Sequence, residues 1–87
     1  MDIRQVIGAN ARALRLARGL TQAQVATRLG VDRAHVSALE QGQRNPTAIS
    51  LAQIAAALEA TVSDLVDEQS EHTIATRTTV PSSDSEK

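Results

Sequence analysis

The chain has 87 residues and a formal net charge of −1 at pH 7, and it contains neither cysteine nor any aromatic residue. This length makes one small domain, and the lack of cysteine excludes a disulfide framework and a cysteine-based metal site. The lack of aromatic rings removes the stacking platforms that proteins use on single strands and RNA loops. No apolar run reaches membrane-spanning length and the amino terminus lacks a signal-peptide layout, so we expect a cytoplasmic protein with no membrane partner.

The charge is unevenly distributed along the chain. Up to Leu58, seven arginines outweigh three acidic residues, a net charge of +4. From Glu59 onward, two basic residues oppose seven acidic ones, a net charge of −5. Scattered arginines are often only a solvated surface, but their confinement to one part of the chain favours nucleic acid as its partner.

The first predicted helix covers residues 3–17. Its buried face carries Ile7, Ala11 and Leu14. Gly8 lies inside this helix, where glycine costs up to about 1 kcal/mol relative to alanine. A close approach of another helix is one explanation for a glycine at this position.

Two short capped helices joined by a tight turn follow. Thr21 and Gln24 form the pattern of a capping box, Gly30 permits the reversal of the chain, and Asp32 is expected to cap the second helix. Gly42 sits where a glycine closes a helix. The apolar residues expected on the inner side are Val25, Ala26, Leu29, Val36 and Leu39. The pattern predicts a helix-turn-helix whose second helix, about 33–41, presents a polar face to duplex DNA.

Two further helices are predicted after a loop. One starts at Pro46 or Thr47 and ends near Leu58, and the other covers residues 62–66, with Thr61 as its cap and Asp64 completing a capping box. The residues of the longer helix expected to be buried are Leu51, Ile54, Ala55 and Leu58.

The composition turns polar and acidic beyond Asp67. We therefore divide the chain into a DNA-binding domain, residues 1–68, and a disordered tail, residues 69–87. Residues 72–80 are β-prone, so a strand formed on dimerisation or on a protein partner is the alternative for the tail.

A series of residues occurs in a fixed order along residues 3–66. Its members are Arg15, Leu20-Thr21-Gln22, Val25-Ala26, Leu29-Gly30-Val31, Val36-Ser37, Leu39-Glu40, Gly42 and Pro46. This series resembles the Cro and lambda-repressor-like helix-turn-helix domain of the XRE family. The resemblance implies an all-α fold of five helices that binds double-stranded DNA.

The resemblance also implies which residues meet the bases. They are Arg33, Ala34, Ser37 and Ala38. A guanidinium can pair with guanine through two hydrogen bonds, and alanine methyl groups can touch the methyl group of thymine. The alternative for Arg33 is a solvated arginine or one paired with Asp32. The alternative for the three small residues is that they only keep the exposed face of the helix narrow.

The residues expected at the DNA backbone are Gln22, Gln41, Gln43, Arg44 and Asn45. Backbone N–H groups at the start of the helix that contains Gln22 also favour an anion. Weaker candidates, for nonspecific electrostatic attraction, are Arg12, Arg18 and Arg28. We expect His35 to lie beside the DNA backbone or in solvent.

Arg15 and Glu40 are interpreted as a structural ion pair, as the resemblance implies. Leu65 and Val66 are candidates for a dimer interface, with a place in the core as the alternative. His35 and His72 have no partner at catalytic or metal-ligand spacing and no phosphate-binding glycine loop is present, so we expect neither an enzyme nor a cofactor.

These observations predict a transcriptional regulator that reads duplex DNA as a homodimer on a two-fold symmetric operator. Dimerisation is expected because one module touches too few base pairs to specify a site. The alternative is an antitoxin that binds a protein toxin through its acidic tail and also regulates its own operon.

Overall fold

The computed structural model describes residues 2–68, and the predictions for the tail, residues 69–87, lie outside them. Within these residues the structure has five helices and no strand, as the sequence predicts. The helices are α1 (Ile3–Ala17), α2 (Gln22–Leu29), α3 (Arg33–Glu40), α4 (Ala48–Ala57) and α5 (Val62–Val66).

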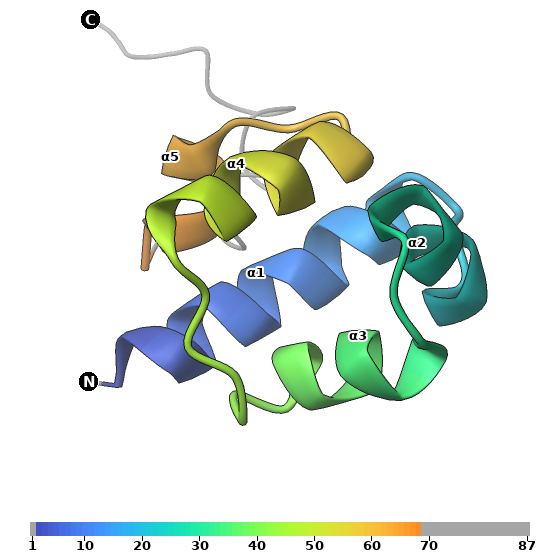
Figure 1. The fold of residues 1–87 in the computed structure, drawn as a ribbon. Helices are drawn as coiled ribbons and strands as arrows, with labels where there is room; N and C mark the ends of the chain where they lie inside the picture. Colours follow the sequence, from blue (N-terminus) through green and yellow to red (C-terminus); the bar gives the residue numbers. More distant parts are fainter. Residues whose placement is uncertain (1, 69–87) are drawn as a thin grey trace, which may run out of the picture.

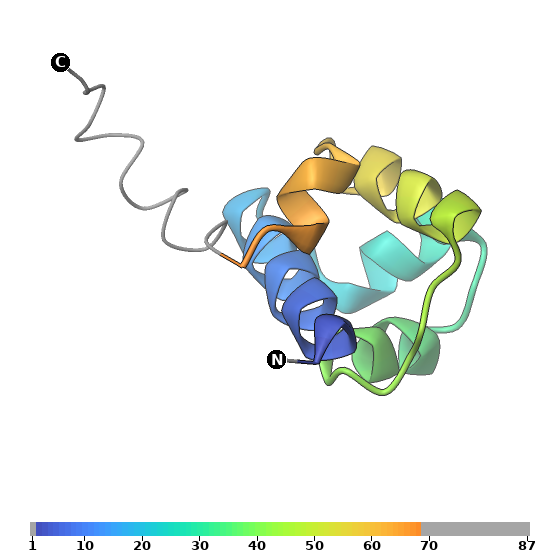
Figure 2. The same ribbon diagram turned by 90° about the vertical axis from the view of Figure 1, so that its left-hand side faces the viewer.

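The long helix α1 passes through the middle of the molecule, and the other helices pack around it. Figure 1 shows α3 below α1, α4 above it and α2 at its carboxyl end. The view turned by 90° shows α5 alongside α1, with which it is in contact (Figure 2). Helix α3 is held against both α1 and α2, and its remaining side faces away from the body of the protein.

One hydrophobic core joins all five helices. Its buried members are Ile7, Ala11, Leu14, Val25, Ala26, Val36, Leu39, Ile54, Ala55, Leu58 and Leu65. Leu29 and Leu51, predicted to be buried, are only partly buried at the rim of this core. Ala57 is buried although the sequence pattern did not predict it.

The predicted helix caps are present with one exception. Thr21 and Thr61 each accept from the backbone three residues later, and both capping boxes are complete. Asp32 is the residue before α3, but its side chain makes no capping hydrogen bond. Its carboxylate is exposed, so water solvates the charge in place of the helix backbone.

A carboxylate also caps the start of α1. The side chain of Arg4 donates to Asp2 Oδ1 and Oδ2, and the Arg4 backbone N–H donates to Oδ1. These hydrogen bonds hold the pKa of Asp2 below its usual value.

Two arginines with no expected structural role fix the carboxyl end of α4. Arg18 donates to the carbonyl oxygens of Leu58 and Glu59 at 3.2 and 2.8 Å. Arg28 donates to the Ala57 carbonyl at 2.8 Å. The carbonyl groups of Ala57 and Leu58 are at the end of α4, where a helix leaves carbonyl groups without partners inside it, and Glu59 follows directly. Arg18 and Arg28 therefore have fixed partners within the protein and are not free surface cations.

Candidate nucleic-acid interface

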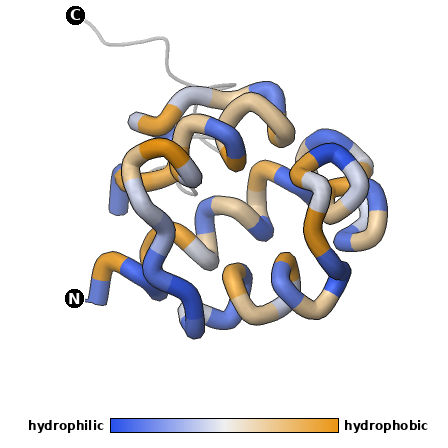
Figure 3. Tube along the Cα trace, in the orientation of Figure 1, coloured by the Kyte–Doolittle hydropathy of each residue, from blue (hydrophilic) through white to orange (hydrophobic). Residues whose placement is uncertain are grey.

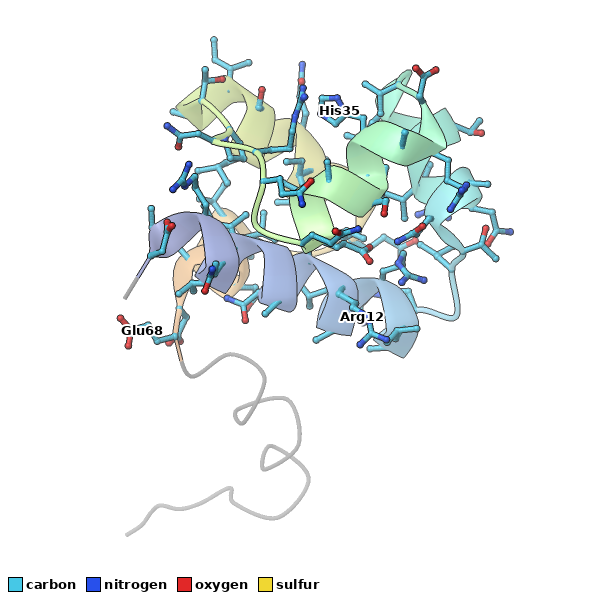
Figure 4. The ribbon with its side chains drawn as sticks, turned by 90° about the horizontal axis from the view of Figure 1, so that it is seen from below. Arg12, His35 and Glu68 are labelled. Carbon is cyan, nitrogen blue, oxygen red and sulfur yellow. The ribbon has the colours of Figure 1, made fainter. Side chains whose placement is uncertain are left out.

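The surface of α3 that points away from the core carries the residues predicted to meet the bases. Figure 4 views the molecule from below, the side on which α3 lies. Arg33 and Ala34 are exposed, and Ser37 and Ala38 are half-buried. Only a methyl group or a hydroxyl extends from the last three, so the backbone of α3 can come close to a groove floor.

The predicted ion pair between Arg15 and Glu40 is present and anchors the end of α3 to α1. Arg15 Nε donates to Glu40 Oε2 at 2.6 Å, and Nη2 donates to Oε1 at 3.1 Å. The two side chains are only 11% and 5% exposed. Arg15 Nη1 also donates to the carbonyl oxygen of Leu20 at 2.9 Å, just before α2. One guanidinium therefore connects α1, the turn before α2, and α3.

Gln22 extends this set of contacts to the surface. Its Nε2 donates to Glu40 Oε1 at 3.1 Å, and its Oε1 accepts from Arg33 Nη1 at 3.0 Å. The side-chain amide of Gln22 thus bridges the buried ion pair and the first residue of α3. The sequence pattern did not indicate this bridge, because the partners lie 11 and 18 residues away along the chain.

The connection between α3 and α4 is a strongly hydrophilic part of the chain (Figure 3). Gly42, with a φ of 77°, closes α3 as predicted, and its N–H donates to the Leu39 carbonyl oxygen at 3.1 Å. Gln41 Nε2 donates to Ser37 Oγ at 2.9 Å. Gln41 therefore lies on the same side of α3 as a residue predicted to meet the bases.

The other predicted backbone contacts lie just beyond Gln41. Gln43, Arg44 and Asn45 are all exposed. Gln43 Nε2 reaches Gln41 Oε1 at 3.4 Å, and Arg44 Nη2 lies 3.0 Å from His35 Nδ1. Among the expected backbone contacts after α3, Gln41 thus bonds Ser37 and Arg44 contacts His35, while Gln22 bonds both the first and the last residue of that helix.

The two dimer candidates differ in their exposure. Leu65 is 0% exposed and belongs to the core, so it cannot touch a second protomer in this conformation. The alternative given above, a core residue, is correct for Leu65. Val66 is 36% exposed and remains available. Large apolar side chains that the sequence analysis did not single out are also exposed, namely Ile3, Leu16, Ile49 and Val62.

Within residues 2–68, no group of three or more histidine or acidic side chains is arranged to hold a metal ion. In the same part of the chain, no helix combines the length and the apolar character needed to cross a bilayer. The surface on and beside α3 instead consists of small side chains, hydrogen-bonding amides and guanidinium groups, which are the groups that contact base edges and phosphates.

The chain is also similar to proteins that are already known. A family model described as helix-turn-helix matches residues 12–65. The HTH-type transcriptional regulator y4dJ of Sinorhizobium fredii is 42% identical over 77 residues, which is 88% of this chain and 100% of that protein.

Two solved structures have a similar fold. One is the clp gene regulator ClgR from Corynebacterium glutamicum, with a TM-score of 0.73 and 32% identity over 76% of this chain and 85% of that one. The other is the restriction-modification controller protein C.AhdI from Aeromonas hydrophila, with a TM-score of 0.66 and 35% identity. That match covers 71% of this chain and 94% of the controller protein.

Proposed function

The chain belongs to the helix-turn-helix family and is a transcriptional regulator with a DNA-binding fold, and we propose that it recognises a specific sequence in duplex DNA with α3. In this proposal α3 enters the major groove, where each base pair presents a distinct pattern of donors and acceptors. Gln22 and the residues after α3 then contact phosphates on either side of the groove.

The observation that carries the proposal is the way in which Arg33 is held at the start of α3. Its guanidinium is bonded to Gln22, which is bonded in turn to the enclosed pair of Glu40 and Arg15. Side chains whose orientation is fixed before binding lose less conformational freedom on binding. This support favours Arg33 as a base-reading residue over an unconstrained surface cation.

We further propose that two copies bind together on an operator with two-fold symmetry. One α3 offers Arg33 and three small residues, which is too few contacts to select one site in a genome. A symmetric dimer doubles the contacts and places the two recognition helices about 34 Å apart on one face of the duplex. Val66 is the candidate for the dimer surface, and the exposed Val62 lies on the same helix.

Selection from a pool of random duplexes tests this function without assuming a target gene. ClgR is named as a regulator of clp genes and C.AhdI as a controller of restriction-modification. Because these roles differ, the selection should not start from the target of either protein. We expect enrichment of a sequence with two-fold symmetry, its half-sites about one helical turn apart. Enrichment of no sequence would contradict sequence-specific binding, and enrichment of a single asymmetric site would contradict the dimer.

Replacement of Arg33 by alanine tests the role of α3 on the selected duplex. We expect a loss of about 1–3 kcal/mol of binding free energy and a relaxed preference at one base pair in each half-site. Arg12→Ala is the matched control. Arg12 is an exposed arginine on α1 (Figure 4), and its replacement by alanine removes the same charge as Arg33→Ala does. The control should weaken operator and random duplex alike, and an equal result for Arg33→Ala would refute base reading by Arg33.

A further inference from the structure

Arg44 and His35 form a polar contact at the edge of the proposed interface. Arg44 Nη2 lies 3.0 Å from His35 Nδ1. A guanidinium stays protonated and has only donors, so Nδ1 must accept the hydrogen bond. The neutral imidazole then carries its proton on Nε2. A hydrogen bond across this contact therefore requires the Nε2–H tautomer of His35.

Two clefts adjoin the half-buried imidazole, whereas Arg44 is exposed. Figure 4 shows His35 between α3 and α4. One cleft beside the ring, of about 150 Å³, is lined by residues that include Leu39, Pro46 and Ser50. A second cleft beside it is lined by Leu29, Val31, Ser50, Gln53 and Ile54, none of which is charged. Among the residues that line the two clefts, Arg44 is thus the charged partner of the ring.

The exposure of Arg44 gives this contact a consequence for DNA binding. A long side chain on an exposed loop samples many rotamers, and it loses that freedom when it grips a phosphate. His35 already restricts the guanidinium and uses one of its five N–H donors. The other donors remain free for phosphate oxygens.

We propose that His35 is a positioning residue that holds the Arg44 guanidinium ready for a phosphate contact beside α3. The inference rests on the proposed DNA binding. It adds a residue that was assigned neither to the base contacts nor to the backbone contacts. His35 acts in this way through its Nδ1 lone pair, and the shape of the ring alone is not sufficient.

Two substitutions of His35 separate its lone pair from its bulk. His35→Leu keeps a side chain of intermediate size but removes the acceptor. His35→Asn keeps an acceptor oxygen close to the position of Nδ1. We expect Arg44→Gln to weaken binding by about tenfold per protomer at 0.1 M salt, and His35→Leu to cause a part of that loss because the guanidinium is no longer restricted. We expect His35→Asn to retain most of the affinity.

The salt dependence of binding shows whether Arg44 still reaches a phosphate. In Arg44→Gln the slope of log K against log salt should fall by about 0.9 for each phosphate that is no longer neutralised, or about 1.8 for a dimer, whereas His35→Leu keeps the charge of Arg44 and should keep most of the slope. The double variant should bind no more weakly than Arg44→Gln alone. An additive loss of affinity in the double variant would overturn the proposal.

The ¹⁵N spectrum of the imidazole in the free protein gives an independent test without DNA. We expect the wild-type protein to show the ¹⁵N chemical shifts of the Nε2–H tautomer, and we expect these shifts to change in Arg44→Gln. An Nδ1–H tautomer would overturn the proposal even if His35→Leu failed to fold.

All binding variants are measured on random duplex as well as on the selected operator, because a phosphate contact acts on any sequence. Equal wild-type binding to both duplexes would reject the proposed sequence-specific function while leaving the effect of His35 measurable. If the wild-type protein prefers the operator and His35→Leu binds that operator with undiminished affinity, only the positioning role is rejected.

Discussion

The most enclosed charges of the described residues belong to Arg15 and Glu40, whose side chains are only 11% and 5% exposed. Such a pair is costly to desolvate, and its Coulombic attraction repays that cost only with good geometry and further hydrogen bonds. Here Arg15 also donates to Leu20, and Glu40 also accepts from Gln22. Each charge therefore has more than one partner, and removal of either charge leaves the other buried.

Arg15→Met should destabilise the fold by about 3–5 kcal/mol, because the carboxylate of Glu40 loses its cation in a poorly solvated place. The combined variant Arg15→Met, Glu40→Leu should recover most of that loss, since no unpaired charge remains. Urea denaturation followed by circular dichroism measures both free energies of unfolding. A cost below about 1 kcal/mol for the single substitution would show that water reaches Glu40.

At the scale of helices, the contact between α1 and α3 depends on the missing side chain of Gly8. A Cβ atom at this position would clash with the Leu39 carbonyl oxygen and lie 2.8 Å from that of Glu40. Both obstacles are backbone atoms at the end of α3, so they cannot rotate away. This close approach explains a glycine inside α1, as the sequence analysis suggested.

Gly8→Ala should therefore destabilise the protein by about 1–3 kcal/mol, the usual cost of overpacking a core, although alanine is the better helix former. Ala9→Gly is the matched control on the exposed side of α1 and should cost about 1 kcal/mol from propensity alone. Thermal unfolding of the three proteins compares these effects. A Gly8→Ala protein more stable than wild type would contradict the close approach of α1 and α3.

The extent to which each element could be predicted depends on how local its determinants are. The starts of α2 and α5 follow from Thr21 with Gln24 and from Thr61 with Asp64, whose partners lie three residues apart. The capping bond expected from Asp32 is absent, because an exposed carboxylate has water as a competing partner. A local pattern therefore locates a helix end more reliably than it assigns a hydrogen bond.

Contacts between distant segments could not be read from the same patterns. Arg18 and Arg28 bond carbonyl groups 40 and 29 residues further along the chain. The buried side chain of Asn10 donates to the carbonyl oxygens of Leu65 and Asp67. These pairings depend on how the helices pack, which residue spacing does not specify. For the same reason Leu65 could be assigned to the core only once α5 was placed against α1.

At the scale of the molecule, the start of the acidic part of the sequence lies away from α3, although Glu59 pairs with Arg28 of the basic part at 3.3 Å. The connection between α4 and α5, where the acidic part begins with Glu59, lies on the opposite side of the molecule from α3 (Figure 1). Arg33 and Arg44 lie at or beside α3. In the proposed complex this separation keeps the Glu59 carboxylate away from the phosphates, whereas the exposed Asp32 lies at the start of α3.

The domain division predicts that residues 1–68 are sufficient for folding and for DNA binding. The buried core extends only from Ile7 to Leu65 among the described residues. Residues 69–87 carry Arg77 and Lys87 against Glu71, Asp84 and Glu86, a net charge of −1. Their deletion should therefore leave the midpoint of thermal unfolding unchanged and have little effect on the salt slope of binding to random duplex.

The same deletion tests how the proposed dimer is held together. If α5 supplies the interface through Val66, the truncated protein should dimerise and bind the selected operator as the full chain does. Sedimentation at several protein concentrations and operator binding measure the two properties. Loss of dimerisation with an unchanged unfolding midpoint would instead assign the dimer contact to residues 69–87. Val66→Asp in the full chain is the complementary variant, because it places a charge in the proposed interface and should weaken operator binding more than binding to a single half-site.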